Sequence, residues 1–227
     1  MRKAAAYCMT RNLYHAALPS IKSLLINSDV EVIYLIIEDD EFPVQLPRTK
    51  VINVSNQTFF PAGGPNYVQR FTYMVLMRAA LHRILKEHRV LSLDYDTIID
   101  GDISELWDLP LADYYLAAGL EPHKTRSIYF LAINAGVMML NLKKLRDGKG
   151  DEIIEALNTK HFAFNEQDAI NELCQGGILP LDPKYNQHTW SYPTDEKPVI
   201  VHYAGYAEDV WKNFELPQKY ASIEVTK

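Results

Sequence analysis

The stretch Val90-Leu91-Ser92-Leu93-Asp94-Tyr95-Asp96-Thr97-Ile98-Ile99 places two carboxylates, one residue apart, at the end of an apolar run. The run before Asp94 is nearly all apolar, which predicts a buried strand. In an α/β protein, side chains at the carboxyl ends of strands lie where the sheet opens toward a ligand. Two hard oxygen donors at such a position suit Mg²⁺ or Mn²⁺ and leave coordination positions for phosphates. The stretch therefore predicts a metal-dependent site for a phosphorylated substrate.

The composition indicates one acidic domain. The chain has 227 residues, 48% hydrophobic and 23% charged, which is enough to bury a core as a single domain over residues 1–227. A formal net charge of -6 without a long basic block argues against nucleic-acid binding. Cys8 and Cys174 lie in apolar surroundings, which argues against a disulfide framework and a cysteine-based zinc site. Because no apolar run reaches the length of a signal peptide or a membrane span, we expect a cytoplasmic protein.

Strand and helix patterns alternate along the chain, which predicts an α/β fold. Apolar runs predict strands at 3–9, 30–37, 50–54, 90–93, 115–120, 178–181 and 199–202. Apolar residues at helical spacing predict helices at 14–26, 67–86, 103–107, 151–159 and 166–174. The apolar segment 135–142 is expected to be buried, and 55–66, with its Pro and Gly residues, is expected to be a loop. Strands interleaved with helices imply a parallel-dominated sheet covered on both faces.

The residues after the acidic pair extend it into a longer pattern. Asp94-x-Asp96 alone is as typical of a capped turn as of a metal site, but Asp100-Gly101-Asp102 and Leu106-Trp107 follow it. The extended pattern resembles glycosyltransferase family 8, the retaining glycosyltransferases that include glycogenin and bacterial lipopolysaccharide galactosyltransferases. The resemblance implies a single GT-A (Rossmann-like) domain with a mixed, mainly parallel sheet and helices on both faces. Asp100 and Asp102 are expected to form the turn and not to bind a ligand.

A second match lies at Val199-Ile200-Val201-His202-Tyr203-Ala204-Gly205, which is similar to the family's loop of His, an aromatic residue, any residue and Gly. A His that ends an apolar strand is, by itself, more often structural than a ligand. The resemblance implies that Asp94, Asp96 and His202 bind Mn²⁺, with Mg²⁺ as the possible substitute. Imidazole suits Mn²⁺ better than Mg²⁺.

A third match begins at Asn165-Glu166-Gln167-Asp168 and continues to Asn171. Polar residues in the first turn of a helix can simply cap it. The resemblance instead implies that Gln167 and Asp168 are catalytic, with the Gln167 amide facing the reacting sugar carbon and Asp168 as a supporting carboxylate. Gln167 is a poor nucleophile, because its amide oxygen is weakly basic. We therefore expect it to stabilise positive charge at the anomeric carbon and to position the acceptor.

Two further segments extend the resemblance to the donor site. The segment 133–143 looks like the family's N-A-G-V segment, whose small residues let a ligand approach the backbone, although a tight helix–strand contact is the alternative. The segment 9–14 resembles a nucleotide-binding turn, with Tyr14 placed to stack on a base. The resemblance implies that the donor-binding residues are Thr10, Asn12, Tyr14, Arg78, Tyr95, Asn134, Ala135, Gly136 and Gly205.

Three positions depart from the family or leave a choice open. Arg11 stands where many members have a base-reading carboxylate, a role that Asn12 could take. Arg70 and Arg78 are both candidates for the arginine that faces the donor, and spacing does not decide between them. Glu208 occupies the region of a diphosphate-binding lysine in the family, and Lys212 is the alternative cation.

The resemblance implies a retaining, Mn²⁺-dependent enzyme that moves galactose or glucose from a UDP-sugar to a glycan, a lipopolysaccharide-type acceptor or another hydroxyl group. The acceptor is expected to contact the loops 55–66 and 121–126. One alternative is a haloacid-dehalogenase-type phosphatase with Asp94 as nucleophile, although that motif usually opens its domain and here follows residues 1–89. The other alternative is a catalytically degenerate sugar-nucleotide-binding protein, which Glu208 favours.

Overall fold

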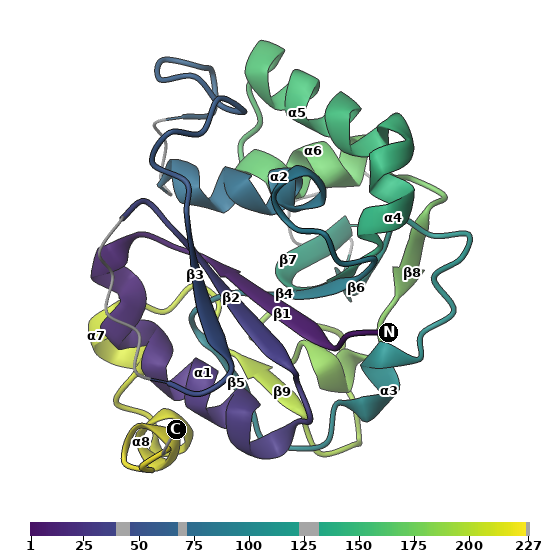
Figure 1. Cartoon of the computed structure of the whole chain (residues 1–227). Coiled ribbons are helices and arrows are strands. Elements are labelled where there is room, and N and C mark those ends of the chain that lie inside the picture. The colour runs from purple at the N-terminus through teal and green to yellow at the C-terminus, as the bar shows by residue number, and fades with distance from the viewer. Residues whose placement is uncertain (40–45, 68–71, 123–131, 226–227) are drawn as a thin grey trace.

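The computed structural model describes residues 1–39, 46–67, 72–122 and 132–225. In these ranges, one sheet has the strand order β3-β2-β1-β4-β7-β6-β8 (Figure 1). Its strands are β1 (Ala4–Cys8), β2 (Val32–Ile37), β3 (Thr49–Asn53), β4 (Val90–Leu93), β6 (Leu116–Glu121), β7 (Ala132–Leu140) and β8 (Ile178–Pro180). Four neighbouring pairs are parallel, and only the pairs of β7 with β4 and with β6 are antiparallel. The predicted mixed, mainly parallel sheet is therefore confirmed.

A second, two-stranded sheet joins β5 (Thr97–Ile99) to β9 (Ile200–His202) in antiparallel register. Thr97 pairs with His202, so the end of β9 lies beside the turn that follows β4. The strand at 199–202 was predicted, but its partner β5 was not, because three residues after a turn, Thr97 and two isoleucines, are too few to give a periodic signal. This pairing brings residues about a hundred positions apart in sequence to one place.

Helices cover both faces of the large sheet, as predicted. They are α1 (Tyr14–Asn27), α2 (Met77–Ile84), α3 (Ser104–Trp107), α4 (Leu142–Lys144), α5 (Gly150–Thr159), α6 (Asn165–Leu173), α7 (Glu208–Trp211) and α8 (Glu215–Ala221). Short 3-10 turns lie at Arg11–Leu13, Tyr73–Leu76 and Pro183–Tyr185, and a π-helical turn lies at Leu145–Lys149. None of the helices in the described ranges is long and apolar enough to cross a membrane.

Two hydrophobic cores lie on opposite faces of the sheet. On β1, Ala4 and Ala6 belong to the core under α2, α5 and α6, whereas Ala5 and Tyr7 belong to the core under α1. This alternation follows from the two-residue repeat of a strand, whose successive side chains point to opposite faces. Both faces of a parallel strand are buried, which explains why these strands are apolar throughout.

The single long helix predicted at 67–86 is wrong. Tyr67 lies in a turn, its N–H donating to the carbonyl of Gly64 at 3.1 Å, and its ring stacks on Tyr73 at 4.6 Å. The helical conformation begins at Tyr73 and ends at Ile84. Leu85 is extended, which lets the polar segment after it lead into β4. The residues 68–71, which include the candidate Arg70, lie outside the described residues.

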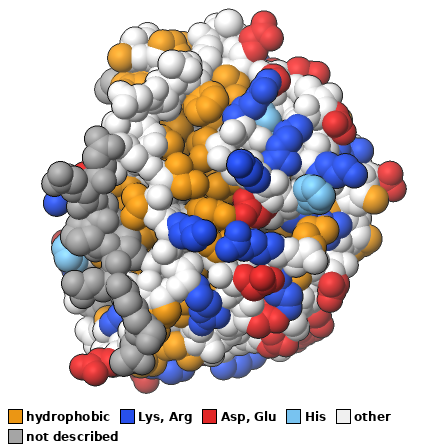
Figure 2. All heavy atoms as spheres, viewed as in Figure 1, with side chains coloured by type: hydrophobic (Ala, Val, Ile, Leu, Met, Phe, Trp, Pro, Cys, Tyr) orange, Lys and Arg blue, Asp and Glu red, His pale blue; other side chains and the backbone are white. Residues whose placement is uncertain are grey.

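The face of the molecule seen in Figure 1 carries charges of both signs. Figure 2 shows hydrophobic side chains near the centre of this face and interspersed acidic and basic side chains beside them. A nucleic-acid-binding face would instead concentrate Lys and Arg in one patch. This face therefore carries mixed charge.

Candidate metal centre and its surroundings

Asp94, Asp96 and His202 come together at the carboxyl end of β4. Each of the three offers one ligand atom, and these atoms all lie within 4.8 Å of one another. The Nε2 atom of His202 is 3.3 Å from Oδ1 of Asp96 and 3.7 Å from Oδ2 of Asp94. The two acidic residues follow β4 directly, and the pairing of β5 with β9 supplies the imidazole. The structure thus brings together the three residues named as metal ligands from the sequence.

The chemistry of this cluster fits a divalent cation. Asp96 and His202 are buried, and Oδ1 of Asp96 has no hydrogen-bond partner among the described residues. Burial lowers the pKa of His202, but the carboxylates of Asp96 and Asp94 together raise it more, so that the pKa lies above its ordinary value. A bound cation would replace that attraction and would hold the imidazole neutral. Two carboxylates and one imidazole are donors that suit Mn²⁺.

Gly136 on β7 makes room for the imidazole. A Cβ atom at this position would lie 2.0 Å from Cε1 of His202. The small residues at 135 and 136 were expected to let a ligand approach the backbone, whereas the space at Gly136 is filled by the ring of His202. Gly136 therefore supports the candidate metal ligand directly, and its role toward the donor stays a prediction.

Arg78 on α2 holds Asp94 in place. Its Nη1 donates to Oδ1 of Asp94 at 2.6 Å and to the carbonyl of Ala135 at 2.9 Å. Its Nη2 is ion-paired with Glu166, which is 1% exposed. Burial raises the pKa of Glu166 to about 7, although Arg78 opposes this shift. This role of Glu166 could not be read from the sequence, because an acidic residue in a first helical turn is usually an exposed cap.

Gln167 and Asp168 occupy the first turn of α6, next to β7. Oε1 of Gln167 accepts a hydrogen bond from the N–H of Ala135 at 2.9 Å. Oδ2 of Asp168 accepts one from the N–H of Phe164 at 3.0 Å, and burial raises the pKa of Asp168. Gln167 is thus tied to the strand that carries Ala135 and Gly136, while Asp168 caps its own helix. Their catalytic roles stay predictions.

The proposed nucleotide-binding turn lies between β1 and α1. Thr10 precedes the 3-10 turn that contains Asn12, and Tyr14 begins α1 with a partly exposed side chain. Arg11 stands where many members of the family have a carboxylate. Its guanidinium is ion-paired with Asp39 at 2.6 Å, so a carboxylate from another segment lies beside this position.

Aromatic side chains surround the other predicted donor residues. Tyr95 packs edge-on against Trp211, with ring centroids 6.1 Å apart. Gly205 has a φ of +83°, which favours glycine, and a Cβ atom there would lie 2.4 Å from the ring of Trp190. Glu208 opens α7, and its Oε1 lies 3.9 Å from Nζ of Lys212, the alternative cation, which directly follows this helix.

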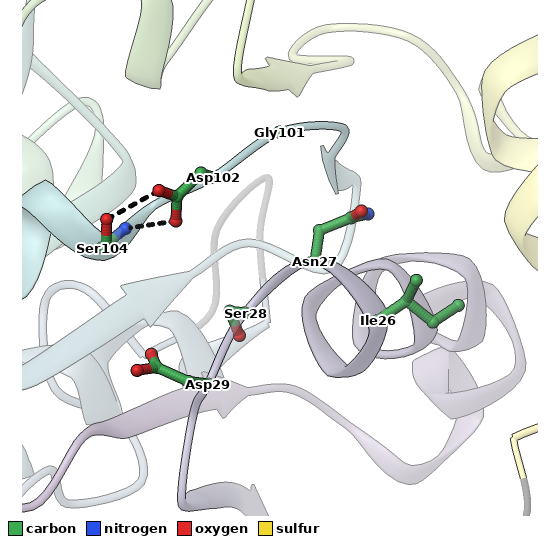
Figure 3. Close-up of a pocket in the computed structure, with 7 residues that line it drawn as sticks. All are labelled: Ile26, Asn27, Ser28, Asp29, Gly101, Asp102 and Ser104. Carbon is green, nitrogen blue, oxygen red and sulfur yellow. Dashed lines mark hydrogen bonds between the residues drawn. The ribbon is translucent and has the colours of Figure 1, made fainter.

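Asp100 and Asp102 lie outside the cluster, as expected. Asp102 accepts hydrogen bonds from the N–H and the hydroxyl of Ser104, and it lines a surface pocket together with Ile26, Ser28 and Asp29 (Figure 3). Asp100 accepts hydrogen bonds from Lys219 at 2.8 Å and Tyr220 at 2.7 Å, which fasten α8 to the body of the protein. Burial raises the pKa of Asp100, but the hydrogen bonds from these partners lower it by more than burial raises it, so that the pKa falls to about 2.

Comparison with known proteins identifies the family. A family model described as "Glycosyl transferase family 8" matches residues 4–214. Glycosyltransferase GlyE of Streptococcus pneumoniae is 26% identical over 176 residues, which are 69% of this chain and 42% of GlyE. Lipopolysaccharide 1,2-glucosyltransferase of Escherichia coli is 27% identical over 165 residues, which are 61% of this chain and 48% of that enzyme. The chain thus spans about half or less of these two relatives.

Solved structures confirm the GT-A fold. The galactosyltransferase LgtC, solved with donor and acceptor sugar analogs, superposes with a TM-score of 0.75 at 17% identity, covering 97% of both chains. The crystal structure of GlyE superposes with a TM-score of 0.71 at 20% identity, covering 99% of this chain and 61% of GlyE. At these identities, the likeness establishes the fold and leaves the substrates open.

Proposed function

The chain belongs to glycosyl transferase family 8, and from this premise we propose that it transfers galactose or glucose from a UDP-sugar to a hydroxyl acceptor with retention of configuration. The observation that supports this proposal best is the convergence of Asp94, Asp96 and His202, whose ligand atoms lie within 4.8 Å of one another. We assign these three residues to Mn²⁺, with Mg²⁺ as the possible substitute.

The charge distribution suits the departure of a diphosphate. Asp94, Asp96 and His202 would hold a divalent cation, whose charge would offset the negative charge that develops on a leaving nucleoside diphosphate. Arg78 keeps the Asp94 carboxylate at one orientation and places a second positive charge next to the ligand set. Because Arg78 is also ion-paired with buried Glu166, its position does not depend on the substrate.

The proposed donor site surrounds this ligand set. Tyr14 would stack on the base, and Ala135 would face the sugar from β7, where Gln167 already contacts its N–H. We propose that Gln167 stabilises positive charge at the anomeric carbon and positions the acceptor, with Asp168 holding the start of α6. The further proposed donor-binding residues are Thr10, Asn12, Arg78, Tyr95, Asn134, Gly136 and Gly205.

A glycan or lipopolysaccharide-type acceptor is part of the proposal. It is supported by the E. coli relative, whose name assigns it to lipopolysaccharide, and by the fold of LgtC. Of the two loops expected at the acceptor, 55–66 is described and has no helix or strand, whereas most of 121–126 lies outside the described residues.

A donor-hydrolysis screen tests the proposal. Nucleotide sugars are incubated with the protein and Mn²⁺, and release of the nucleoside diphosphate is compared between wild type and Asp96→Ala. We expect UDP-galactose or UDP-glucose to be the preferred donor and Asp96→Ala to lose roughly 10²- to 10³-fold in rate. Asp102→Ala, which changes an aspartate outside the cluster, serves as the control and should retain the rate. Equal rates for wild type and Asp96→Ala would exclude the metal assignment.

One alternative from the sequence stays testable. Glu208 stands where the family has a diphosphate-binding lysine, which favours a protein that binds the sugar nucleotide without transferring it. Calorimetric binding of UDP in the presence of Mn²⁺, without hydrolysis or transfer for any donor, would support that alternative. The phosphatase alternative is dropped, because the family match covers residues 4–214.

A further inference from the structure

A chain of buried hydrogen bonds leads to the ring nitrogen of His202 that faces away from Asp94 and Asp96. Nδ1 of His202 lies 3.0 Å from Oδ1 of Asn186, and Nδ2 of Asn186 donates to Oδ1 of Asn134 at 3.1 Å. Nδ2 of Asn134 donates in turn to a carboxylate oxygen of Glu121 at 3.0 Å. Asn186 is 1% exposed and His202 is 4% exposed, so water does not compete at the imidazole end of the chain.

The groups at the far end fix the direction of every bond in this chain. The N–H of Gly136 can only donate, and it donates to Oδ1 of Asn134 at 3.0 Å. The carboxylate of Glu121 accepts, so the amide of Asn134 has one orientation that satisfies both neighbours. Asn186 must then turn its NH₂ group toward Asn134. Its carbonyl oxygen is left facing His202.

The backbone packs closely against both side chains at the imidazole end of this chain of hydrogen bonds. A Cβ atom on Gly119, at the irregular register of β6, would lie 2.9 Å from Cβ of Asn186. The missing Cβ of Gly136 likewise provides the space for the ring of His202. Two glycines of the central sheet therefore form a cradle in which Asn186 and His202 pack side by side.

We propose that Asn186 is a positioning residue that sets the tautomer of His202. Its carbonyl oxygen requires the imidazole proton to be on Nδ1, which leaves the lone pair of Nε2 directed toward Asp94 and Asp96. In metal-binding histidines, one ring nitrogen donates a hydrogen bond to a neighbour and the other binds the ion. The inference rests on the proposed function, because it concerns His202 as a ligand.

The metal-free protein offers a demanding test, because two neighbours of His202 favour opposite tautomers. Oδ1 of Asp96, at 3.3 Å from Nε2, favours a proton on Nε2, whereas Asn186 favours it on Nδ1. Long-range ¹H–¹⁵N correlation spectra at about pH 9, where a neutral imidazole dominates, distinguish the two forms. The His202→Gln variant identifies the signal among the seven histidines.

We expect wild-type His202 to carry its proton on Nδ1. In Asn186→Leu, which lacks the acceptor, the proton should move to Nε2. In Asn186→Asp, which keeps an acceptor oxygen, it should stay on Nδ1. A proton on Nε2 in wild type, or an unchanged tautomer in Asn186→Leu, would overturn the inference even if the protein binds metal and transfers sugar.

Binding of Mn²⁺ alone gives a second readout. Titration followed by electron paramagnetic resonance should show Asn186→Leu binding Mn²⁺ roughly 10- to 100-fold more weakly than wild type, as expected when a partner of a metal ligand is removed. The imidazole ¹⁴N coupling to bound Mn²⁺ should weaken with it, and Asn186→Asp should restore both. Equal affinity and unchanged coupling in Asn186→Leu would contradict the inference.

Asn141→Leu is the matched control. Asn141 is also buried and hydrogen-bonded, to the carbonyls of Leu111 and Tyr114, but it lies at the opposite end of β7. It should lower the melting temperature as Asn186→Leu does and leave Mn²⁺ affinity unchanged. A wild type that keeps the proton on Nδ1 but binds no Mn²⁺ would refute the proposed function and leave the hydrogen-bond inference standing.

Discussion

Substitution of Gly136 by Ala should disable the candidate metal centre while leaving the fold intact. The added Cβ would lie 2.0 Å from Cε1, 2.5 Å from Nδ1 and 2.7 Å from Nε2 of His202. Ordinary contact begins at 3.4 Å, so the ring must retreat by about 1.4 Å at its nearest atom. That displacement is larger than the tolerance of a metal ligand, and a misplacement of 1 Å in a reacting group can cost about 10²-fold in rate.

The assay combines three measurements on Gly136→Ala. Mn²⁺ affinity should fall, and donor hydrolysis should drop about 10²-fold. The free energy of unfolding in urea should fall by about 1–3 kcal/mol, as is usual for an extra methyl group in a packed interior. Gly101→Ala is the matched control, because its Cβ would meet Val199 at an ordinary 3.4 Å. Wild-type Mn²⁺ affinity in Gly136→Ala would refute the account of the cradle.

Three further substitutions test other parts of the structure. Arg78→Met should destabilise the protein by about 3–5 kcal/mol in urea unfolding, because it leaves the buried carboxylate of Glu166 unpaired, and adding Glu166→Leu should recover part of that loss. Asp100 has a pKa lowered to about 2 in the folded protein, so its contribution to stability is present above its ordinary pKa of 3.8 and is lost as the pH falls toward 2. Asp100→Asn should therefore be less stable than wild type at pH 7, by on the order of 1 kcal/mol for such a partly solvated cluster, and thermal unfolding of the two proteins should converge near pH 2; a constant difference across this range would contradict the assignment. Glu208→Lys should tighten UDP binding several-fold in calorimetry, with a gain that shrinks as salt is added, and an unchanged affinity would place Glu208 away from the diphosphate.

Most of the fold could be predicted from the sequence, because its strands are buried on both faces. A continuous apolar run such as 90–93 has few alternatives, and β4 occupies Val90–Leu93 as predicted. The helix predicted at 67–86 failed at its start, since Tyr67 lies in a turn and its ring stacks on that of Tyr73, where the helical conformation begins. The predicted strand ends elsewhere differ from the structure by one or two residues.

Residues of the candidate site could be predicted only where they belong to a sequence motif. Asp94, Asp96 and His202 could be named, because their spacing and flanking residues resemble a family pattern. Glu166 and Asn186 could not, because their significance comes from contacts with residues far away in sequence. Asn186 meets Asn134 across 52 positions, and no local period or composition reports such a pair.

The small sheet of β5 and β9 sets the order in which the site can be assembled. During synthesis, Asp94 and Asp96 leave the ribosome about a hundred residues before His202. A nascent chain that stops short of β9 has two clustered carboxylates and no imidazole, so its affinity for the cation stays low. Under the proposed assignment of these ligands to Mn²⁺, tight binding should therefore mark completed folding, and fragments ending before residue 200 should fail to show it.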